Sequence, residues 1–557
     1  MPDTQVMEGP WLPGLTADGF EWRLDGPFNI AVACADNQSF DSPAIIVDRG
    51  ADAPDVLSFG QLADRSRRLI TYLRSRGVGA GDRIAIMCAQ SAETAIAHLA
   101  AYRMGAIAVP LSVKFGPEAV LFRMTDSGAK AAVFDPVCLD RLGGELASLT
   151  DLTTVIVTGD GGNSSSATAF DHIDSLLPTG DLPATDADDP ALLIYTSGTT
   201  GAPKGALHGH RVLLGHLPGV RRSQDGFPRA DDVFWTPADW AWAGGLLDVL
   251  LPSLYYGRPV VAADVRPTPE NVERILRQHR VTCSFLPPTV LKTMRNSGID
   301  YSRTSLRSSC SGGEALGEAL VDWAKQALGI HINEIYGQTE INLIIGTCHS
   351  DSSSPPGSLG TATPGFDVVL LDAEGQLAAP GETGEICVRL PSPNAFLRYW
   401  NAPEKTTEKT ADGLVHTGDL AVRDSDGFYW FTGRNDDLIS TAGYRVGPGE
   451  IEELVLRHPS VEMVAVIGVP DELRTEAIVA YVVPREGVST STSFAREIQQ
   501  FVKDRLAFYQ YPREVIFVDS LPATTTGKIQ RGRLREDHAA RFQVHATPSE
   551  SRRDESH

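Results

Sequence analysis

Apolar residues follow two alternating spacings in the first half of the chain, and this alternation predicts helices followed by strands. Residues 59–78 (FGQLADRSRRLITYLRSRGV) place apolar side chains at helical spacing up to Gly77, whereas residues 82–88 (DRIAIMC) form a short apolar run. The same pair recurs in 91–111 and in 117–135. A repeated order of helix and strand predicts an α/β fold with mainly parallel sheets.

The second half of the chain continues this pattern and then changes. Residues 271–288 and 317–337 each read as a helix followed by a strand, so we expect two similar α/β halves in one large domain. From 365 to 390 the sequence is rich in glycine and β-branched residues, which predicts a small β-rich unit. Residues 449–506 predict helix, two strands and helix, so a compact α+β unit of about a hundred residues is expected over 441–540.

These changes in pattern predict the domain organisation. A chain of 557 residues exceeds one typical core, so two or more domains are expected. We predict a large N-terminal domain over 1–434, a hinge over 435–440 and a small C-terminal domain over 441–540. The polar residues 541–557 are expected to form a disordered tail.

Composition narrows the class of partner. The 49 basic and 71 acidic side chains give a formal charge of −22, which disfavours non-specific binding to nucleic acid or to anionic membranes. The seven cysteines are scattered without a C-x-x-C pair, so buried thiols are expected in place of a disulfide framework or a zinc site. The start of the chain is acidic and interrupted by prolines, unlike a signal peptide, and no apolar run is long enough to span a bilayer. We expect a cytoplasmic protein.

The stretch YTSGTTGAPKG, Tyr195 to Gly205, is the first candidate for chemistry. It follows the strand-like run PALLI, and its small residues free backbone N–H groups to point at an anion, which predicts a phosphate loop. The stretch does not match the G-x-x-x-x-G-K-[ST] loop, because Pro203 replaces the second glycine and Gly205 follows Lys204.

Further motifs offer nucleotide-binding groups, each of them weak alone. YGQTE, Tyr336 to Glu340, combines a ring that can stack on a base with a carboxylate that can bind Mg²⁺. HTGD ends in Asp419, a carboxylate suited to a ribose diol. TGRNDD follows with Arg434 and Asp436, and TTTGKIQR carries Lys528 near the C-terminus.

Together and in this order, the motifs resemble the adenylate-forming superfamily of acyl-CoA synthetases, luciferases and peptide-synthetase adenylation domains. The matching stretches are YTSGTTGAPKG, YGQTE, HTGDLAVRDSDGFYWFTGRNDD, STAGYRVGPGEIE and LPATTTGKIQRGRLR, over roughly 190–535. The N-terminal EWRLDGPFNIA is similar to the medium-chain acyl-CoA synthetase branch. The resemblance implies an AMP-forming acid–thiol ligase that uses ATP, Mg²⁺ and CoA. A carboxylic acid first forms an acyl-adenylate with release of pyrophosphate, and CoA then displaces AMP.

The resemblance also implies a role for each matching position. Those expected to bind ATP are Thr196, Ser197, Gly198, Thr199, Thr200, Gly201, Lys204, Gly313, Glu314, Ala315, Tyr336, Gly337, Thr339, Asp419 and Arg434. Thr339 is expected at the α-phosphate, Glu340 at Mg²⁺, and Lys528 at the reacting carboxylate and phosphate oxygens.

The same resemblance implies that the small domain rotates between the two half-reactions. Asp436 is the hinge position of the family. After rotation, Gly443, Tyr444 and Arg445 are expected at CoA. PATTTGK also resembles a site at which some relatives are acetylated, and acetylation of Lys528 would neutralise its charge.

The identity of the acid is less constrained. Members specific for acetate carry tryptophan at the position of Gly337, so a glycine there is expected to leave space for a larger acid, medium-chain, branched or aryl. Trp242 falls beside the acyl site in the family and is either a pocket wall or a core residue. The medium-chain branch usually has Thr-Gly where this chain has Ile341 and Asn342, so Ile341 is expected at the pocket wall.

Two other classes of function stay open from sequence. An adenylating enzyme could load a separate acyl carrier protein, although no carrier domain follows in this chain. A silent acyl-nucleotide-binding protein is disfavoured by the intact Lys528, Thr339 and Glu340. A homodimer is the candidate assembly.

Overall fold

The computed structural model describes most of the chain. The described residues are 14–16, 19–22, 26–159, 167–180, 182–196, 203–313, 316–350, 354–434, 437, 439–441, 444–471, 475–506, 510–524 and 528–545.

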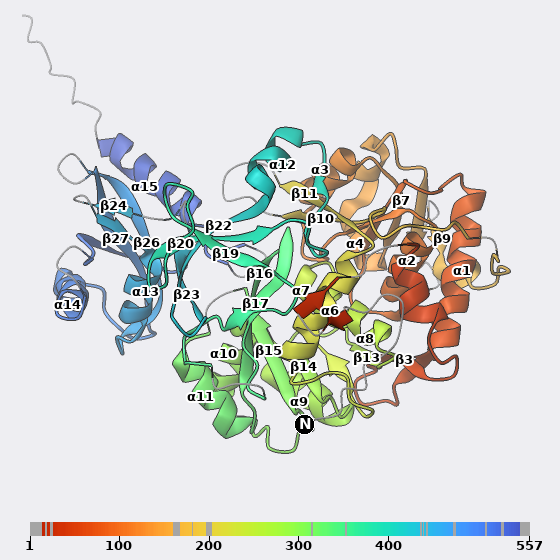
Figure 1. Cartoon of the computed structure of the whole chain (residues 1–557), viewed down its shortest axis with the longest axis horizontal. Coiled ribbons are helices and arrows are strands. Elements are labelled where there is room, and N and C mark those ends of the chain that lie inside the picture. The colour runs from red at the N-terminus through yellow and green to blue at the C-terminus, as the bar shows by residue number, and fades with distance from the viewer. Residues whose placement is uncertain are drawn as a thin grey trace, which may run out of the picture.

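The first half of the large domain is built on a sheet in which eight strands are described (Figure 1). The strands from β10 through β6, β5, β7 and β8 to β9 run parallel, and β10 also pairs with β11 in an antiparallel hairpin. In spatial order the strands are β21 (Arg398–Tyr399), β11 (Lys204–Gly209), β10 (Pro190–Thr196), β6 (Ile107–Pro110), β5 (Arg83–Met87), β7 (Ala129–Phe134), β8 (Thr154–Val157) and β9 (Thr168–Ala169). The helices of this half are α1 (Phe59–Ser75), α2 (Ala92–Arg103), α3 (Pro117–Ser127), α4 (Pro136–Leu142) and α5 (Phe170–Ile173).

Helix α1 shows why the apolar spacing predicted these elements. Ser58 caps it: its hydroxyl accepts a hydrogen bond from the Gln61 backbone N–H, and the Gln61 side-chain oxygen accepts one from the Ser58 backbone N–H. The helix buries one apolar face and ends before Gly77, which adopts a positive φ of 77°. Helix α2 ends at Arg103, whose buried guanidinium pairs with Asp36 at 2.6 Å.

Among the described residues, no helix is long and apolar enough to cross a membrane.

The second half of the large domain is built on a sheet with nine described strands. Its central strands are parallel, as predicted, and antiparallel pairs lie at both edges. In spatial order the strands are β18 (Thr361–Ala362), β17 (Ile341–Gly346), β16 (Ile332–Gln338), β15 (Ser308–Gly312), β14 (Cys283–Phe285), β12 (Phe234–Trp235), β13 (Val260–Ala262), β3 (Pro43–Val47) and β4 (Asp55–Ser58). The helices are α6 (Val212–Ser223), α7 (Ala243–Gly245), α8 (Leu251–Tyr255), α9 (Pro269–Gln278), α10 (Pro288–Ser297) and α11 (Glu318–Ala327), and a π-helical turn, η3 (Leu246–Leu250), follows α7. A two-stranded ribbon, β1 (Gly14–Thr16) and β2 (Gly19–Glu21), lies outside both sheets.

One hydrophobic core joins the two halves. Leu69 of α1 and Leu99 of α2 belong to the same buried cluster as Ile45 of β3 and Leu254 of α8. Helices of the first half are therefore packed against the second half, and the two halves form one domain.

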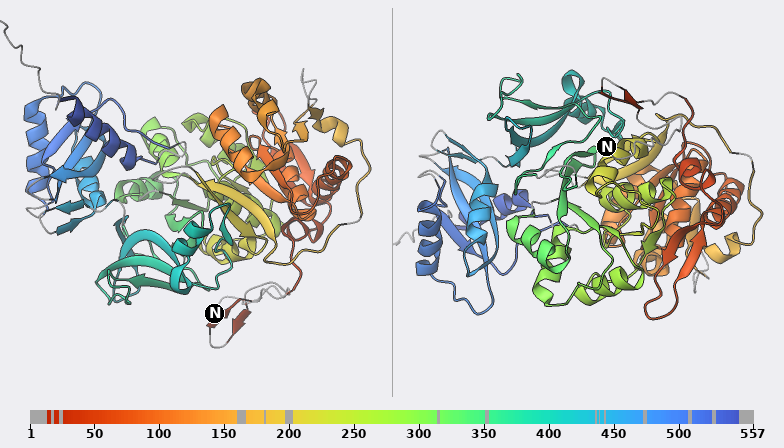
Figure 2. Two further views of the ribbon diagram at one scale, coloured as in Figure 1. Left: turned by 90° about the horizontal axis from the view of Figure 1, so that it is seen from above. Right: turned by 60° about the horizontal axis from the view of Figure 1, so that its bottom comes forward.

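The predicted β-rich unit is a four-stranded antiparallel sheet. Its strands are β19 (Val368–Leu371), β20 (Thr383–Arg389), β22 (Leu414–Arg423) and β23 (Tyr429–Arg434). The short helix α12 (Pro403–Lys409) precedes β22. Figure 2 shows this sheet, in teal, as a layer of its own against the large domain.

The C-terminal residues form a separate α+β lobe, drawn in blue in Figure 1. Its strands are β24 (Ile439–Thr441), β25 (Tyr444–Val446), β26 (Val461–Asp471), β27 (Thr475–Pro484) and β28 (Glu514–Phe517), and its helices are α13 (Pro448–Leu456), α14 (Thr492–Lys503) and α15 (Arg531–His545). Its two buried clusters draw only on residues from 439 onward. Helix α15 extends to His545, and residues 546–557 lie outside the described part. The boundaries at 434, 440 and 541 and the disordered tail stay predictions.

Candidate active site

The predicted phosphate loop connects the two strands of a hairpin. Thr196 at the end of β10 pairs with Lys204 at the start of β11, and the Thr196 hydroxyl lies 3.4 Å from the Lys204 carbonyl oxygen. The two ends of the loop are therefore held side by side at the sheet. Residues Ser197, Gly198, Thr199, Thr200 and Gly201 lie outside the described residues.

A second group of predicted residues meets at Asp419, where β16, β22 and β23 come together. The Tyr336 hydroxyl donates a 2.7 Å hydrogen bond to Asp419 Oδ2, and Arg434 lies 3.2 Å from Asp419 Oδ1. Burial, and then the charge of Asp419, raise the pKa of Tyr336 well above its ordinary value, so the hydroxyl stays a donor. Three residues that are distant in sequence thus form one polar group.

Gln338 adds to this group and was not predicted. Its amide nitrogen donates to Asp419 Oδ2 at 2.7 Å and to the Thr417 carbonyl at 2.8 Å. Its amide oxygen accepts a 2.8 Å hydrogen bond from Lys409 Nζ at the end of α12. Lys409 thus connects through Gln338 to Asp419.

Lys409 is the residue that sequence reasoning missed most clearly. Burial lowers its pKa, while the carboxylates of Glu340 and Asp419 oppose that shift. In sequence it lies within EKTTEKT, where Lys405 and Glu408 are exposed, so nothing in the pattern distinguishes it from a surface lysine.

Glu340, the predicted Mg²⁺ ligand, connects to the phosphate loop through Tyr399. The Tyr399 hydroxyl donates a 2.5 Å hydrogen bond to Glu340 Oε1, and Lys204 Nζ lies 5.5 Å from the centre of the Tyr399 ring. Among the described residues, Glu340 Oε2 makes no hydrogen bond. One available carboxylate oxygen beside a phosphate loop fits Mg²⁺, which commonly takes one or two carboxylates together with phosphate oxygens and waters.

Lys528 lies on the C-terminal lobe, and its charge interacts with charged residues of the large domain. The surrounding protein lowers the pKa of Lys528 by displacing water, although the side chain keeps contact with solvent, and nearby Arg434 lowers it further. Asp419 opposes the shift. The charges of Lys528, Arg434 and Asp419 therefore influence one another across the junction between the two domains.

An ion-pair network holds the start of α15, which follows Lys528. Arg531 lies 2.6 Å from Glu452 and 3.2 Å from Asp437, and Arg535 lies 3.0 Å from Asp437. The predicted hinge residue Asp436 and the CoA residue Gly443 lie outside the described residues. Tyr444 and Arg445 belong to β25, and their side chains are outside the described part.

The expectation that Gly337 leaves open space is wrong. A Cβ at this position would lie 2.5 Å from the Leu343 amide nitrogen and 2.6 Å from the Asn342 Cα. Gly337 is therefore needed for the close approach of β16 and β17, where Leu343 takes a positive φ of 55°.

By contrast, Gly313 has a φ of 92° with no atom within 4 Å of its Cβ position, a conformation that favours glycine. Its neighbours Glu314 and Ala315 lie outside the described residues.

The other predicted acyl-pocket residues point in different directions. Ile341 is fully buried in the core of the β19–β23 sheet, and its expected role as a pocket wall stays a prediction. Neighbouring side chains in a strand point to opposite faces, so Asn342 points away from this core. Trp242 is half-buried and packs edge-to-face on Phe115, with the ring centres 5.7 Å apart, against the core of the first half.

Of the two neighbours Ile341 and Asn342, it is Asn342 that faces the segment after Trp242. Its amide donates a 2.8 Å hydrogen bond to Asp248 Oδ1 and lies 3.3 Å from the His216 ring. Burial raises the pKa of Asp248 to about 7, and the hydrogen bond from Asn342 opposes this shift. The large domain thus carries a polar group beside β17, the strand that holds Asn342.

The seven cysteines are free and buried, as the sequence predicted. The fold and the polar groups at its domain junction define an α/β enzyme that binds a nucleotide.

Comparison with known proteins identifies the family. A model described as AMP-binding enzyme matches residues 33–400, and one described as AMP-binding enzyme C-terminal domain matches residues 450–528. The chain belongs to the AMP-binding enzyme family.

Relatives and solved structures agree with this assignment. The acetyl-coenzyme A synthetase of Bacillus subtilis is 32% identical over 493 residues, covering 87% of this chain and 85% of that protein. The human mitochondrial acyl-coenzyme A synthetase ACSM5 is 30% identical over 511 residues, covering 89% and 86%. The crystal structure of the anthranilate CoA ligase AuaEII with anthranoyl-AMP superposes with a TM-score of 0.83 at 28% identity, covering 94% of this chain and 99% of that one. The expected resemblance, fold class and enzyme class, an AMP-forming acid–thiol ligase, are confirmed.

Proposed function

We propose that this enzyme converts a carboxylic acid, ATP and CoA into acyl-CoA, AMP and pyrophosphate through an acyl-adenylate. The observation that carries the proposal is the meeting of Tyr336 and Arg434 at Asp419, with the charge of Lys528 from the other domain acting on the same carboxylate. A lysine of one domain has no structural need to lie near a buried carboxylate of the other. It is suited to a reaction in which negative charge develops between the domains.

The Asp419 group would bind the nucleoside. The Asp419 carboxylate accepts hydrogen bonds from Tyr336 and Gln338, and ribose hydroxyls can replace such donors at the same oxygens. The Tyr336 ring lies beside this carboxylate, which supports its predicted role at the adenine. Gly313 would line the base with Glu314 and Ala315.

The hairpin loop would hold the β- and γ-phosphates. The paired ends Thr196 and Lys204 fix where the loop leaves the sheet, and Lys204 stays close to Tyr399 and Glu340. Mg²⁺ bound at Glu340 would neutralise phosphate charge. Thr339, beside Glu340, would contact the α-phosphate.

In the first step a carboxylate oxygen of the acid attacks the α-phosphorus and the bond to the bridging oxygen of pyrophosphate breaks. The Lys528 ammonium would bond the carboxylate and α-phosphate oxygens as charge develops on them. In the second step the CoA thiolate attacks the acyl carbon and AMP leaves with the electron pair of the broken C–O bond. Tyr444, Arg445 and Gly443 would serve that step after rotation about Asp436.

We propose that the acid is larger than acetate. The tryptophan ring that acetate-specific members carry at this position is missing here. The proposal rests on that missing ring and not on open space at Gly337, because the backbone of Asn342 and Leu343 fills its Cβ direction. Asn342 and Asp248 add polar atoms near the segment that follows Trp242. A medium-chain, branched or aryl acid is therefore proposed.

A panel of carboxylic acids tests the proposal. Pyrophosphate release is measured with and without CoA, and AMP formation is measured with CoA, for straight-chain, branched and aryl acids. We expect at least one acid larger than acetate to support both, with acyl-CoA as product. Activity on acetate alone would contradict the proposed acid class, and acyl transfer only to an added carrier protein would contradict the proposed acceptor.

A further inference from the structure

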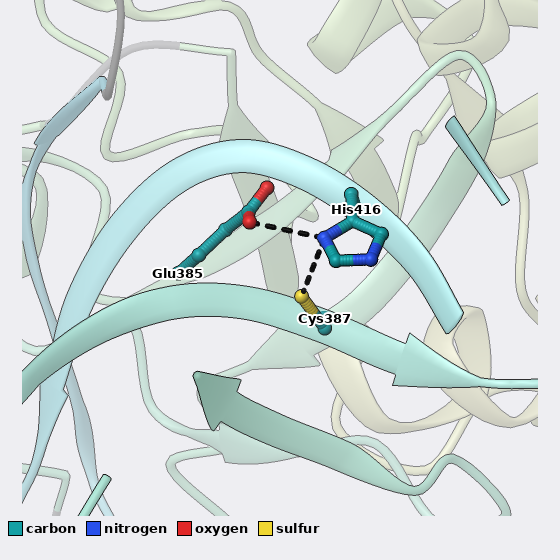
Figure 3. A group of neighbouring side chains, drawn as sticks. All are labelled: Glu385, Cys387 and His416. Atoms are coloured by element: carbon teal, nitrogen blue, oxygen red, sulfur yellow. Dashed lines mark hydrogen bonds and ion pairs between the residues drawn. The ribbon is translucent and has the colours of Figure 1, made fainter. Parts of the chain in front are cut away.

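Three side chains of different chemistry meet on one face of the β-rich sheet, next to the Asp419 group (Figure 3). Glu385 and Cys387 are two positions apart on β20, and His416 on β22 is the cross-strand partner of Cys387. His416 Nδ1 lies 3.0 Å from Glu385 Oε2 and 3.5 Å from Cys387 Sγ, and one ligand atom from each residue lies within 4.8 Å of the others. Strand pairing thus fixes the three side chains in one place.

These separations suit a small metal ion. Bonds of about 2.0–2.3 Å from a tetrahedral metal to nitrogen, oxygen and sulfur place the ligand atoms about 3.3–3.7 Å from one another. Thiolate with imidazole and carboxylate is a donor set for zinc, whereas Mg²⁺ and Ca²⁺ prefer oxygen ligands alone. We propose that Glu385, Cys387 and His416 form a Zn²⁺-binding site, with water as the fourth ligand.

The proton balance of binding is simple. The metal forms bonds to Cys387 Sγ, His416 Nδ1 and a Glu385 oxygen, and the thiol proton is released to solvent. The imidazole proton moves from Nδ1 to Nε2, which has no hydrogen-bond partner among the described residues. Because outer partners of a ligating histidine typically contribute about 10–100-fold in affinity, the missing partner predicts binding weaker by about that factor than at a zinc site whose histidine has such a partner.

The proposed Zn²⁺ site is coupled to the Asp419 group through one turn. Glu385 Oε1 accepts a 2.8 Å hydrogen bond from the Gly418 amide, and Gly418 takes a positive φ of 75° between His416 and Asp419. A metal that draws the Glu385 carboxylate toward Cys387 weakens this bond and loosens the turn that carries Asp419. Zn²⁺ should therefore raise the KM for ATP, a consequence that rests on the proposed function.

Cobalt binding tests the site without any assay of activity. The full-length protein, freed of metals by chelator dialysis, is titrated with Co²⁺ and then with Zn²⁺. We expect a thiolate-to-cobalt absorption band in the near ultraviolet, tetrahedral bands in the visible, and loss of both as one equivalent of Zn²⁺ displaces the cobalt. Cys387→Ser should remove the near-ultraviolet band and weaken metal binding at least tenfold, whereas Cys138→Ser, another buried cysteine, should leave both unchanged.

A second variant keeps the test decisive if Cys387→Ser does not fold. Glu385→Gln retains an acceptor for the Gly418 amide and should still weaken Co²⁺ binding. No band at millimolar Co²⁺, or an unchanged band in the folded variants, would overturn the site. Binding of Zn²⁺ with no change in the KM for ATP would overturn the coupling. A protein that is inactive on every acid would contradict the proposed function and leave the cobalt spectra as they are.

Discussion

At the scale of single residues, the account depends first on the charge of Lys528. Lys528→Ala removes one positive charge from the developing negative charge of adenylation, and such donors are worth about 10²–10³ in rate. We expect acid-dependent ATP–pyrophosphate exchange to fall by about that factor, while the variant still makes thioester from supplied acyl-adenylate and CoA. Equal loss of both half-reactions would contradict the assignment. Acetylation of Lys528 should mimic the variant, because it removes the same charge.

The lowered pKa of Lys528 gives a pH dependence with a defined sign. The ammonium form of Lys528 is the active one, and its pKa lies below the ordinary lysine value of 10.5. As the pH rises, Lys528 should therefore lose its charge earlier than an ordinary lysine. The rate of adenylation should fall at a correspondingly lower alkaline pH.

Lys409 is expected to act through Gln338. Lys409→Met removes a charged hydrogen bond to an amide that holds Asp419, and bonds of this kind contribute about 1.5–3 kcal/mol. The KM for ATP should rise about 10-fold or more, with a smaller effect on kcat, in initial-rate measurements at saturating acid and CoA. Lys409→Arg, which keeps the charge, should recover part of the loss. A change confined to kcat would show that Lys409 does not position the Asp419 group.

Gly337 was predicted from a motif to be important, but for the wrong physical reason. Sequence alone could not show that the backbone of β17 occupies its Cβ direction. Gly337→Ala should lower the free energy of unfolding by about 1–3 kcal/mol, the usual cost of overpacking, measured by urea denaturation. Gly79→Ala, where nothing lies within 4 Å, is the matched control and should change it little. Equal effects of the two substitutions would contradict the close approach.

At the scale of elements, local patterns predicted the helices and strands of the large domain well, and long-range pairing less well. The spacing in 59–78 predicted α1 because its cap and apolar face are local. No local pattern shows that β3 pairs with β13, more than two hundred residues later, so the early strands of the second sheet were missed. The same limit applies to Lys409, to Gln338 and to the proposed Zn²⁺ site at Cys387, because their partners come from other elements.

The start of α15 is the element that positions Lys528. Arg531→Gln breaks its ion pairs with Glu452 and Asp437, while Arg535→Gln removes one pair with Asp437 alone. We expect Arg531→Gln to slow adenylation about tenfold, measured by pyrophosphate exchange, and Arg535→Gln to slow it less. Since the loss should act through Lys528, thioester formation from supplied acyl-adenylate should fall less than adenylation in both variants. The opposite order of the two half-reactions would show that the network serves the CoA step.

At the scale of the whole molecule, two lobes have separate hydrophobic clusters, and the proposed reaction needs both. In that proposal the large domain supplies the Asp419 group and the hairpin loop, and the C-terminal lobe supplies Lys528. The order of the motifs predicts this division, because each motif carries chemistry that is recognisable in sequence. The acid could not be predicted in the same way, since its pocket is shaped by contacts such as those of Gly337 and Asn342.

The most direct test of the account is a rapid-quench measurement of ATP cleavage by the wild-type enzyme with an accepted acid and no CoA. We predict a burst of pyrophosphate close to one equivalent per active site, with bound acyl-adenylate, followed by AMP and acyl-CoA when CoA is added. Formation of ADP and phosphate, or absence of any burst until CoA is present, would contradict an adenylate-forming mechanism.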